Sequence, residues 1–156
     1  MTGVGNDVLA GGSGEDVLLG GAGTDLVVGG NGVDVVNGGV GTDVELLGNG
    51  DDTAAWNPGD GNDMIVGGLG RDTLAFNGSD ADELMALSAN GQSAVFLRSP
   101  GNIRMDLDGV VRLDLATFGG SDAVTIGDLG GTDVTVAEID LASASGAADT
   151  RDDTVR

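Results

Sequence analysis

A nine-residue repeat runs through the first half of the chain. From residue 11, four consecutive units read GGSGEDVLL, GGAGTDLVV, GGNGVDVVN and GGVGTDVEL, and TGVGNDVLA before them lacks only the first glycine. A fixed short period is typical of a solenoid, whose units stack on one another and do not fold alone. In GGAGTDLVV, six loop-forming residues precede three apolar ones, and glycine loses more backbone freedom on folding than any other residue. The repeat therefore predicts a solenoid that needs some stabilising interaction besides a hydrophobic core.

The period continues with irregular units up to residue 75. LGNGDDTAA at 47–55 has Leu47 in place of the first glycine, Trp56 and Asn57 are inserted, and PGDGNDMIV and GGLGRDTLA restore the pattern. Trp56 is expected to pack inside the solenoid where its width changes.

Two positions of the unit have constant chemistry. The sixth is always aspartate: Asp7, Asp16, Asp25, Asp34, Asp43, Asp52, Asp63 and Asp72. The eighth is mostly aliphatic, which marks the core position. Glu45 is an exception at the eighth position, and we expect a local bulge that turns Glu45 to solvent while Leu46 packs inside.

The charge balance restricts partners and chemistry. The chain has 26 acidic residues, 6 basic residues and neither His nor Cys, for a formal net charge of −20. Disulfides and thiolate metal sites are excluded, and so is any His ligand or His base. Nucleic acid is excluded as a partner because like charge repels its phosphates. Nearly all the acids are Asp, whose short side chain suits a tight loop that binds a hard cation. No apolar run is long enough for a membrane span.

The units match the pattern G-G-x-G-x-D-x-U-x, and residues 2–75 closely resemble the RTX, or hemolysin-type, calcium-binding repeat family of secreted bacterial proteins. The resemblance implies an all-β fold, a parallel β-roll in which six residues of each unit form a turn and three form a strand. It also implies that the ligands of Ca²⁺ are the eight aspartates together with main-chain carbonyls of the turns. The glycine positions concerned are Gly11, Gly12, Gly14, Gly20, Gly21, Gly23, Gly29, Gly30, Gly32, Gly38, Gly39 and Gly41.

The spacing predicts which aspartates meet. Each turn of the roll stacks on the turn two units later, and stacked strands lie roughly 4.7–4.9 Å apart. One edge would then pair Asp7 with Asp25, Asp25 with Asp43 and Asp43 with Asp63. The other edge would pair Asp16 with Asp34, Asp34 with Asp52 and Asp52 with Asp72. These pairs allow up to about six calcium ions.

The second half follows a different pattern. Alternating runs such as NIRMDLD at 102–108 indicate strands, and Asn-Gly in SANGQS at 88–93 indicates a hairpin turn. We expect residues 76–141 to form a β-rich extension or cap and residues 142–156 a frayed polar tail. Arg104 with Asp114, or Arg112 with Asp106, would pair across strands. Whether residues 119–133, which include GGSD, bind calcium stays open.

The sequence favours a calcium-binding module that is not an enzyme. Without His, neither an H-E-x-x-H zinc site nor a Ser-His-Asp triad can form. The resemblance implies folding on Ca²⁺ binding outside the cell and type I secretion as part of a larger bacterial protein. The alternative is a rigid calcium-dependent structural or adhesion scaffold of a cell-surface protein. A monomer is expected, and the sequence identifies no protein partner.

Overall fold

The computed structural model describes residues 3–141 and 153–156, and the regular structure within them is entirely β-strand. The strands are β1 (Val8–Ser13), β2 (Val17–Gly23), β3 (Leu26–Asn31), β4 (Val35–Gly41), β5 (Val44–Asn49), β6 (Thr53–Trp56), β7 (Met64–Leu69), β8 (Asp72–Ser79), β9 (Leu84–Asn90), β10 (Ser93–Ser99), β11 (Ile103–Asp108), β12 (Val110–Phe118), β13 (Ala123–Ile126), β14 (Val136–Asp140) and β15 (Thr154–Val155).

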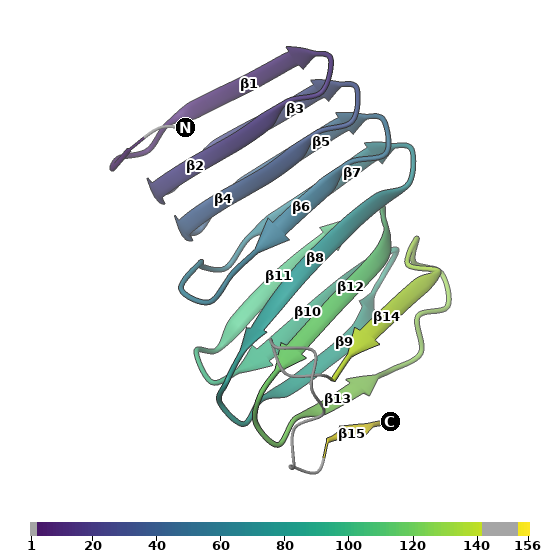
Figure 1. Ribbon diagram of the computed structural model, residues 1–156. Coiled ribbons are helices and arrows are strands. Elements are labelled where there is room, and N and C mark those ends of the chain that lie inside the picture. Colours follow the sequence, from purple (N-terminus) through teal and green to yellow (C-terminus); the bar gives the residue numbers. More distant parts are fainter. Residues whose placement is uncertain (1–2, 142–152) are drawn as a thin grey trace.

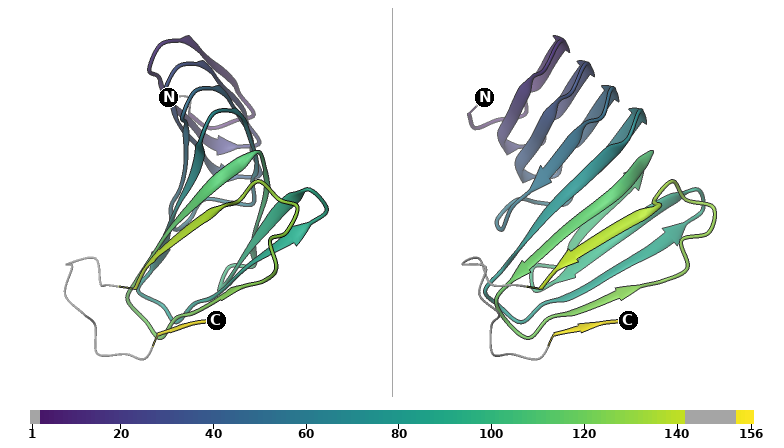
Figure 2. Two further views of the ribbon diagram at one scale, coloured as in Figure 1. Left: turned by 90° about the vertical axis from the view of Figure 1, so that its right-hand side faces the viewer. Right: turned by 45° about the vertical axis from the view of Figure 1, so that its right-hand side comes forward.

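Successive strands of the repeats alternate between two sheets. One sheet has the order β1-β3-β5-β7-β11-β10-β9-β13-β15 and the other β14-β12-β8-β6-β4-β2. Within each sheet the repeat strands pair in parallel, Val8 with Leu26 and Leu26 with Val44. Figures 1 and 2 show the coils stacked on one another, with their strands forming the two sheets. The predicted all-β parallel β-roll is confirmed.

The register follows from the period. Two nonapeptides make one coil, so paired residues are 18 positions apart, as Val17 and Val35 are. Trp56 and Asn57 lengthen one coil by two residues, and the separation becomes 20 between Val44 and Met64. The inserted pair therefore changes one coil without disturbing the stack.

The core lies between the two sheets because side chains alternate along each strand. Eighth-position side chains point inward, and Val27, Val36, Ile65 and Leu74 are fully buried. Each coil thus contributes only two core side chains at this position, and the roll is correspondingly thin.

Aromatic residues fill the core next to the insertion. Trp56 is buried, stacks on Phe76 with ring centroids 4.2 Å apart, and donates its Nε1–H to the Gly61 carbonyl. Phe96 meets the edge of Phe76 at 4.6 Å. The prediction that Trp56 packs inside the roll is confirmed.

The strands after residue 75 continue both sheets. β11 pairs in parallel with β7, and β12 pairs in parallel with β8 and β14. β9, β10 and β11 form an antiparallel meander within the larger sheet. β8, with 8 residues, and β12, with 9, are longer than the repeat strands, and the roll widens toward this end (Figure 2). The division into separate domains at residue 75 stays a prediction.

Several details of the second half differ from expectation. Asn90 pairs with Ser93, so the hairpin turn is Gly91-Gln92, with φ of 71° at Gly91. The arginines pair within their own sheets, Arg104 with Asp106 and Arg112 with Asp114 and Glu138, because β11 and β12 belong to different sheets. The expected frayed tail falls mainly on residues 142–152, outside the described residues, whereas β15 pairs with β13.

Substitution of Gly41 would test how tightly the coils stack. Its φ is 150°, and a Cβ placed on it would overlap the Gly23 carbonyl oxygen of the preceding coil. Gly12 also has a positive φ, 105°, but a Cβ there meets nothing within 4 Å. We expect Gly12→Ala to lose about 1–2 kcal/mol of unfolding free energy through backbone strain alone. Gly41→Ala should lose distinctly more in urea unfolding with calcium present, and equal losses would contradict the stacking.

Candidate metal sites

The aspartates of the repeats form two columns, one along each edge of the roll. The odd column contains Asp7, Asp25, Asp43 and Asp63, and the even column Asp16, Asp34, Asp52 and Asp72. The turn before each strand directs the sixth side chain inward, so Asp7 and Asp16 are half-buried and the other six are buried. All six aspartate pairs expected from the spacing are neighbours in the stack.

Each column is linked by hydrogen bonds from backbone to carboxylate. The N–H of Asp7 donates to Asp25 Oδ1 at 2.8 Å, and the N–H of Asp25 donates to Asp43 Oδ1 at 2.7 Å. The even column repeats this arrangement from Asp16 to Asp34 at 2.9 Å and onward to Asp52 and Asp72. One oxygen of six of the eight carboxylates, all except those of Asp7 and Asp16, is therefore used to hold the register of the turns.

The second carboxylate oxygen has no protein partner in most turns. Oδ2 is buried without a hydrogen-bond partner in Asp16, Asp25, Asp34, Asp43, Asp52 and Asp72. Buried anionic oxygens are costly unless something compensates them. The regular recurrence of the same unpartnered atom indicates a common ligand of positive charge.

Main-chain oxygens converge on the same places. A Cβ placed on Gly11 would lie 2.6 Å from Asp16 Oδ2 and 2.7 Å from the Gly29 carbonyl oxygen of the next turn in the column. A Cβ on Gly67 would likewise meet Asp72 Oδ2 and the Gly109 carbonyl. Only glycine leaves this space to the oxygens.

The donor set fits a hard cation. Ca²⁺ takes about 6–8 oxygen ligands from carboxylates and carbonyls, and both kinds meet in each pair of stacked turns. Among the described residues no three acidic side chains form a cluster. A site in the roll would therefore rely on two carboxylates and the backbone of two turns.

Burial raises the pKa of several column residues. Desolvation is the main cause for Asp43, Asp52 and Asp72, and repulsion from a neighbouring aspartate of the column adds to it. Burial raises the pKa of Asp63 to about 7. The negative charge of these four aspartates is thus unfavourable in the roll without a compensating cation.

Glu45 does not point to solvent, and the expectation of a bulge there is wrong. Its side chain is buried, whereas Leu46 is only half-buried. The pairing of β4 with β6 ends at Val36 and Ala54, before the inserted residues. The Gly38 N–H beyond that point donates to Glu45 Oε1 at 2.6 Å, so Glu45 supplies an acceptor inside the roll. Burial raises its pKa to about 8.

Two buried acids outside the repeats are not among the ligands expected from the sequence, which leaves open only whether residues 119–133, including Asp122, bind calcium. Glu83 and Asp122 are 0% and 2% exposed, and the N–H of Glu83 donates to Asp122 Oδ1 at 2.9 Å. The glycines before Asp122 were visible in GGSD, but nothing near Glu83 matches the nonapeptide. Only the spatial pairing reveals these two residues as partners.

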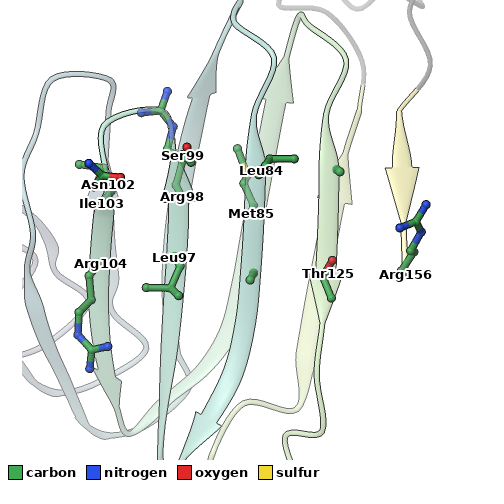
Figure 3. Close-up of a pocket in the computed structure, with 12 residues that line it drawn as sticks. Leu84, Met85, Leu97, Arg98, Ser99, Asn102, Ile103, Arg104, Thr125 and Arg156 are labelled. Carbon is green, nitrogen blue, oxygen red and sulfur yellow. The ribbon is translucent and has the colours of Figure 1, made fainter.

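A pocket also lies away from the two columns, over the second half of the roll. It has a volume of about 520 Å³ over β9, β10, β11 and β13. Its lining combines apolar residues with Ser99, Asn102, Thr125 and three arginines, Arg98, Arg104 and Arg156 (Figure 3). Its lining includes no carboxylate side chain. It therefore offers a cation no carboxylate ligand from a side chain.

The family comparison agrees with the geometry. The model of the RTX calcium-binding nonapeptide repeat matches in four copies, at residues 1–36, 11–45, 20–54 and 59–74. Residues 1–74 carry RTX calcium-binding nonapeptide repeats. The two acid columns of the roll lie within these RTX repeats, and calcium is the cation that the family binds. A comparison with curated proteins found no match. No helix of the described residues has the length and hydropathy needed to cross a membrane.

The raised pKa values predict how pH affects the calcium-free fold. Glu45 shifts from 4.5 to about 8 and Asp63 from 3.8 to about 7, so each carboxyl holds its proton more tightly in the folded chain than in the unfolded one. Their contribution is present at low pH and lost as pH rises through about 7–8. In calcium-stripped buffer, we expect urea stability to fall between pH 5 and pH 8.

The matched variant is Glu45→Gln, which removes one titrating carboxyl and keeps an oxygen acceptor for Gly38. Its stability should depend less on pH over the same range. Calcium-free stability that rises from pH 5 to pH 8 would contradict the assignment.

Proposed function

We propose that this chain is a non-catalytic calcium-binding module that folds on meeting Ca²⁺ outside the cell, within a larger bacterial protein exported by type I secretion. The observation that supports it most is the recurring buried aspartate oxygen without a protein partner in the turns of the RTX repeats. The absence of His and Cys from the sequence supports the non-catalytic part.

The residues that would hold the ions are the eight column aspartates and the turn carbonyls. The carboxylates would come from Asp7, Asp16, Asp25, Asp34, Asp43, Asp52, Asp63 and Asp72. The turn glycines, from Gly11 to Gly41, would supply carbonyl oxygens and the room for the ions. Bound calcium supplies positive charge and oxygen coordination at these places.

Charge explains why folding would depend on calcium. Six bound ions would offset about 12 of the 20 net negative charges. Without them, the self-repulsion of the chain opposes the compact state, as it does for other highly charged chains. A chain that stays expanded where calcium is scarce suits export before folding.

The alternative is a rigid calcium-dependent scaffold in a cell-surface adhesion protein. The unbroken stack of coils in both sheets favours it. In that case the bound calcium would make the roll rigid, and the same residues would bind it.

A calcium titration followed by far-UV circular dichroism tests the proposal. Starting from a calcium chelator, we expect a cooperative change from coil to β signal near 10⁻⁴–10⁻³ M, the range of extracellular modules. Mg²⁺ should replace Ca²⁺ poorly because it demands near-ideal octahedral geometry and keeps its waters. A full β signal in chelator, or full folding by Mg²⁺ alone, would overturn it.

Asp34→Asn sharpens the test because Asp34 takes part in two neighbouring pairs of the even column. Its calcium midpoint should shift to higher concentration than that of the wild type. Asp133→Asn is the matched control, since it removes the same charge from an exposed residue outside both columns. Equal midpoints for the two variants would count against the column as the binding site.

A further inference from the structure

Two turns outside the matched repeats stack in the same way as the RTX turns. Residues 78–83 lead into β9 and residues 117–122 lead into β13, and these strands pair in parallel from Leu84 and Ala123 onward. Their sequences, GSDADE and TFGGSD, do not follow the nonapeptide. Their resemblance to the repeats lies in the backbone and its contacts.

The contacts between these turns reproduce those of the repeats, bond by bond. The Glu83 N–H donates to Asp122 Oδ1 at 2.9 Å, as the Asp7 N–H does to Asp25 Oδ1. The Ala123 N–H donates to the Glu83 carbonyl at 2.9 Å, as the Leu26 N–H does to the Asp7 carbonyl at 3.0 Å. Glu83 and Asp122 therefore hold the sixth positions of two stacked turns.

The preceding positions of the turns agree as well. The Ser121 N–H donates to Asp82 Oδ1 at 2.9 Å, as the Thr24 N–H does to Asn6 Oδ1. Phe118 has a φ of 66° and Gly120 a φ of 126°, at the second and fourth positions, where the repeats have glycines of positive φ. A non-glycine residue at positive φ is uncommon and requires support from the surrounding fold.

An unpartnered buried oxygen faces this pair of turns. Glu83 is fully buried, and its Oε2 has no hydrogen-bond partner. A Cβ on Gly78 would contact that oxygen and would lie 2.9 Å from the Ala116 carbonyl and 3.0 Å from the Thr117 carbonyl. Gly11 meets Asp16 Oδ2 and the Gly29 carbonyl in the same way. The space next to Gly78 thus collects a carboxylate oxygen and carbonyl oxygens, as in the repeats.

Arg98 replaces the turn that would precede Glu83. In the repeats, Oδ1 accepts the N–H of the previous turn in the column, but β9 has β10 on that side. The buried Arg98 guanidinium donates to Glu83 Oε1 from Nε at 2.8 Å and also from Nη2. Arg98 therefore satisfies one oxygen of Glu83 and leaves the other directed at the next turn.

We propose that the turns 78–83 and 117–122 form a further Ca²⁺ site, with Glu83 and Asp122 as carboxylate ligands and with carbonyls of both turns completing it. On the side of Glu83 that faces β10, Arg98 supplies the positive charge that an ion would supply inside the repeat columns. The proposal relies on the calcium-binding role of the repeats only through the likeness of the turns.

The charges permit a divalent cation beside Arg98. Inside a repeat column each aspartate borders the space before its turn and the space after it. Its single negative charge would therefore be shared between two neighbouring ions. Glu83 has the Arg98 guanidinium on one side and the proposed ion on the other. Its negative charge therefore faces positive charge on both sides, as the charge of a column aspartate would. Asp122 accepts the Glu83 N–H and donates its own N–H to Asp153 Oδ1 at 2.9 Å, as a residue inside a column does.

Crystals of the full chain grown in CaCl₂, with anomalous difference maps recorded at long wavelength, test the site directly. We expect a calcium peak between Glu83 and Asp122 in addition to peaks in the repeat turns. Peaks in the repeats with none between these residues would overturn the inference and leave the proposed function standing. A map without any calcium peak would contradict both.

Equilibrium dialysis with radioactive calcium provides a second readout in solution. Asp122→Asn keeps an oxygen acceptor for the Glu83 N–H and removes the charge, so it should bind at least one ion fewer than the wild type. Asp133→Asn, at an exposed position outside the turns, should bind the full number. An unchanged ion count in Asp122→Asn would overturn the site.

Discussion

The constraint on which the roll depends is that its aspartate carboxylates repeat at the distance between neighbouring β-strands. Parallel strands lie roughly 4.7–4.9 Å apart, so one aspartate per turn places like charges next to each other along both edges of the roll. The backbone N–H of six column aspartates donates to one oxygen of the next carboxylate in the column. The other oxygen is buried without a protein partner in six of the turns. Positive charge between the turns would resolve this repulsion, and we propose that calcium bound to the RTX repeats supplies it.

The remaining features of the roll follow from that constraint. Glycines occupy the positions where a Cβ would displace the carboxylate and carbonyl oxygens, as at Gly11 and Gly67. The core is thin because each nonapeptide places one side chain, such as Val27 or Val36, fully inside. Where the chain departs from the period, side chains supply the contacts that the regular repeat lacks there. Glu45 accepts the Gly38 N–H beside the insertion, and Arg98 pairs with Glu83 where the repeat columns have no counterpart.

The sequence predicts the roll well because the same period determines both the register and the columns. The pairing of Val8 with Leu26, and of Asp25 with Asp43, follows directly from two units per coil. The prediction for Glu45 failed because its burial depends on a hydrogen bond made available by an insertion eleven residues later in the chain. The pairing of Glu83 with Asp122 could not be predicted, since 39 residues separate them and only the β9–β13 register brings them together. The arginine pairs depended in the same way on which sheet each strand joins.

Amide hydrogen exchange with and without calcium tests the account most directly, because the amides of Asp16, Asp25 and Asp34 donate to the columns themselves. The account predicts slow exchange at these three amides, and along β1 to β7, in millimolar calcium. After chelation, exchange should approach the rate of an unstructured chain. Equal protection of these amides in both conditions would show that packing alone holds the columns, and would contradict the central role of the cation.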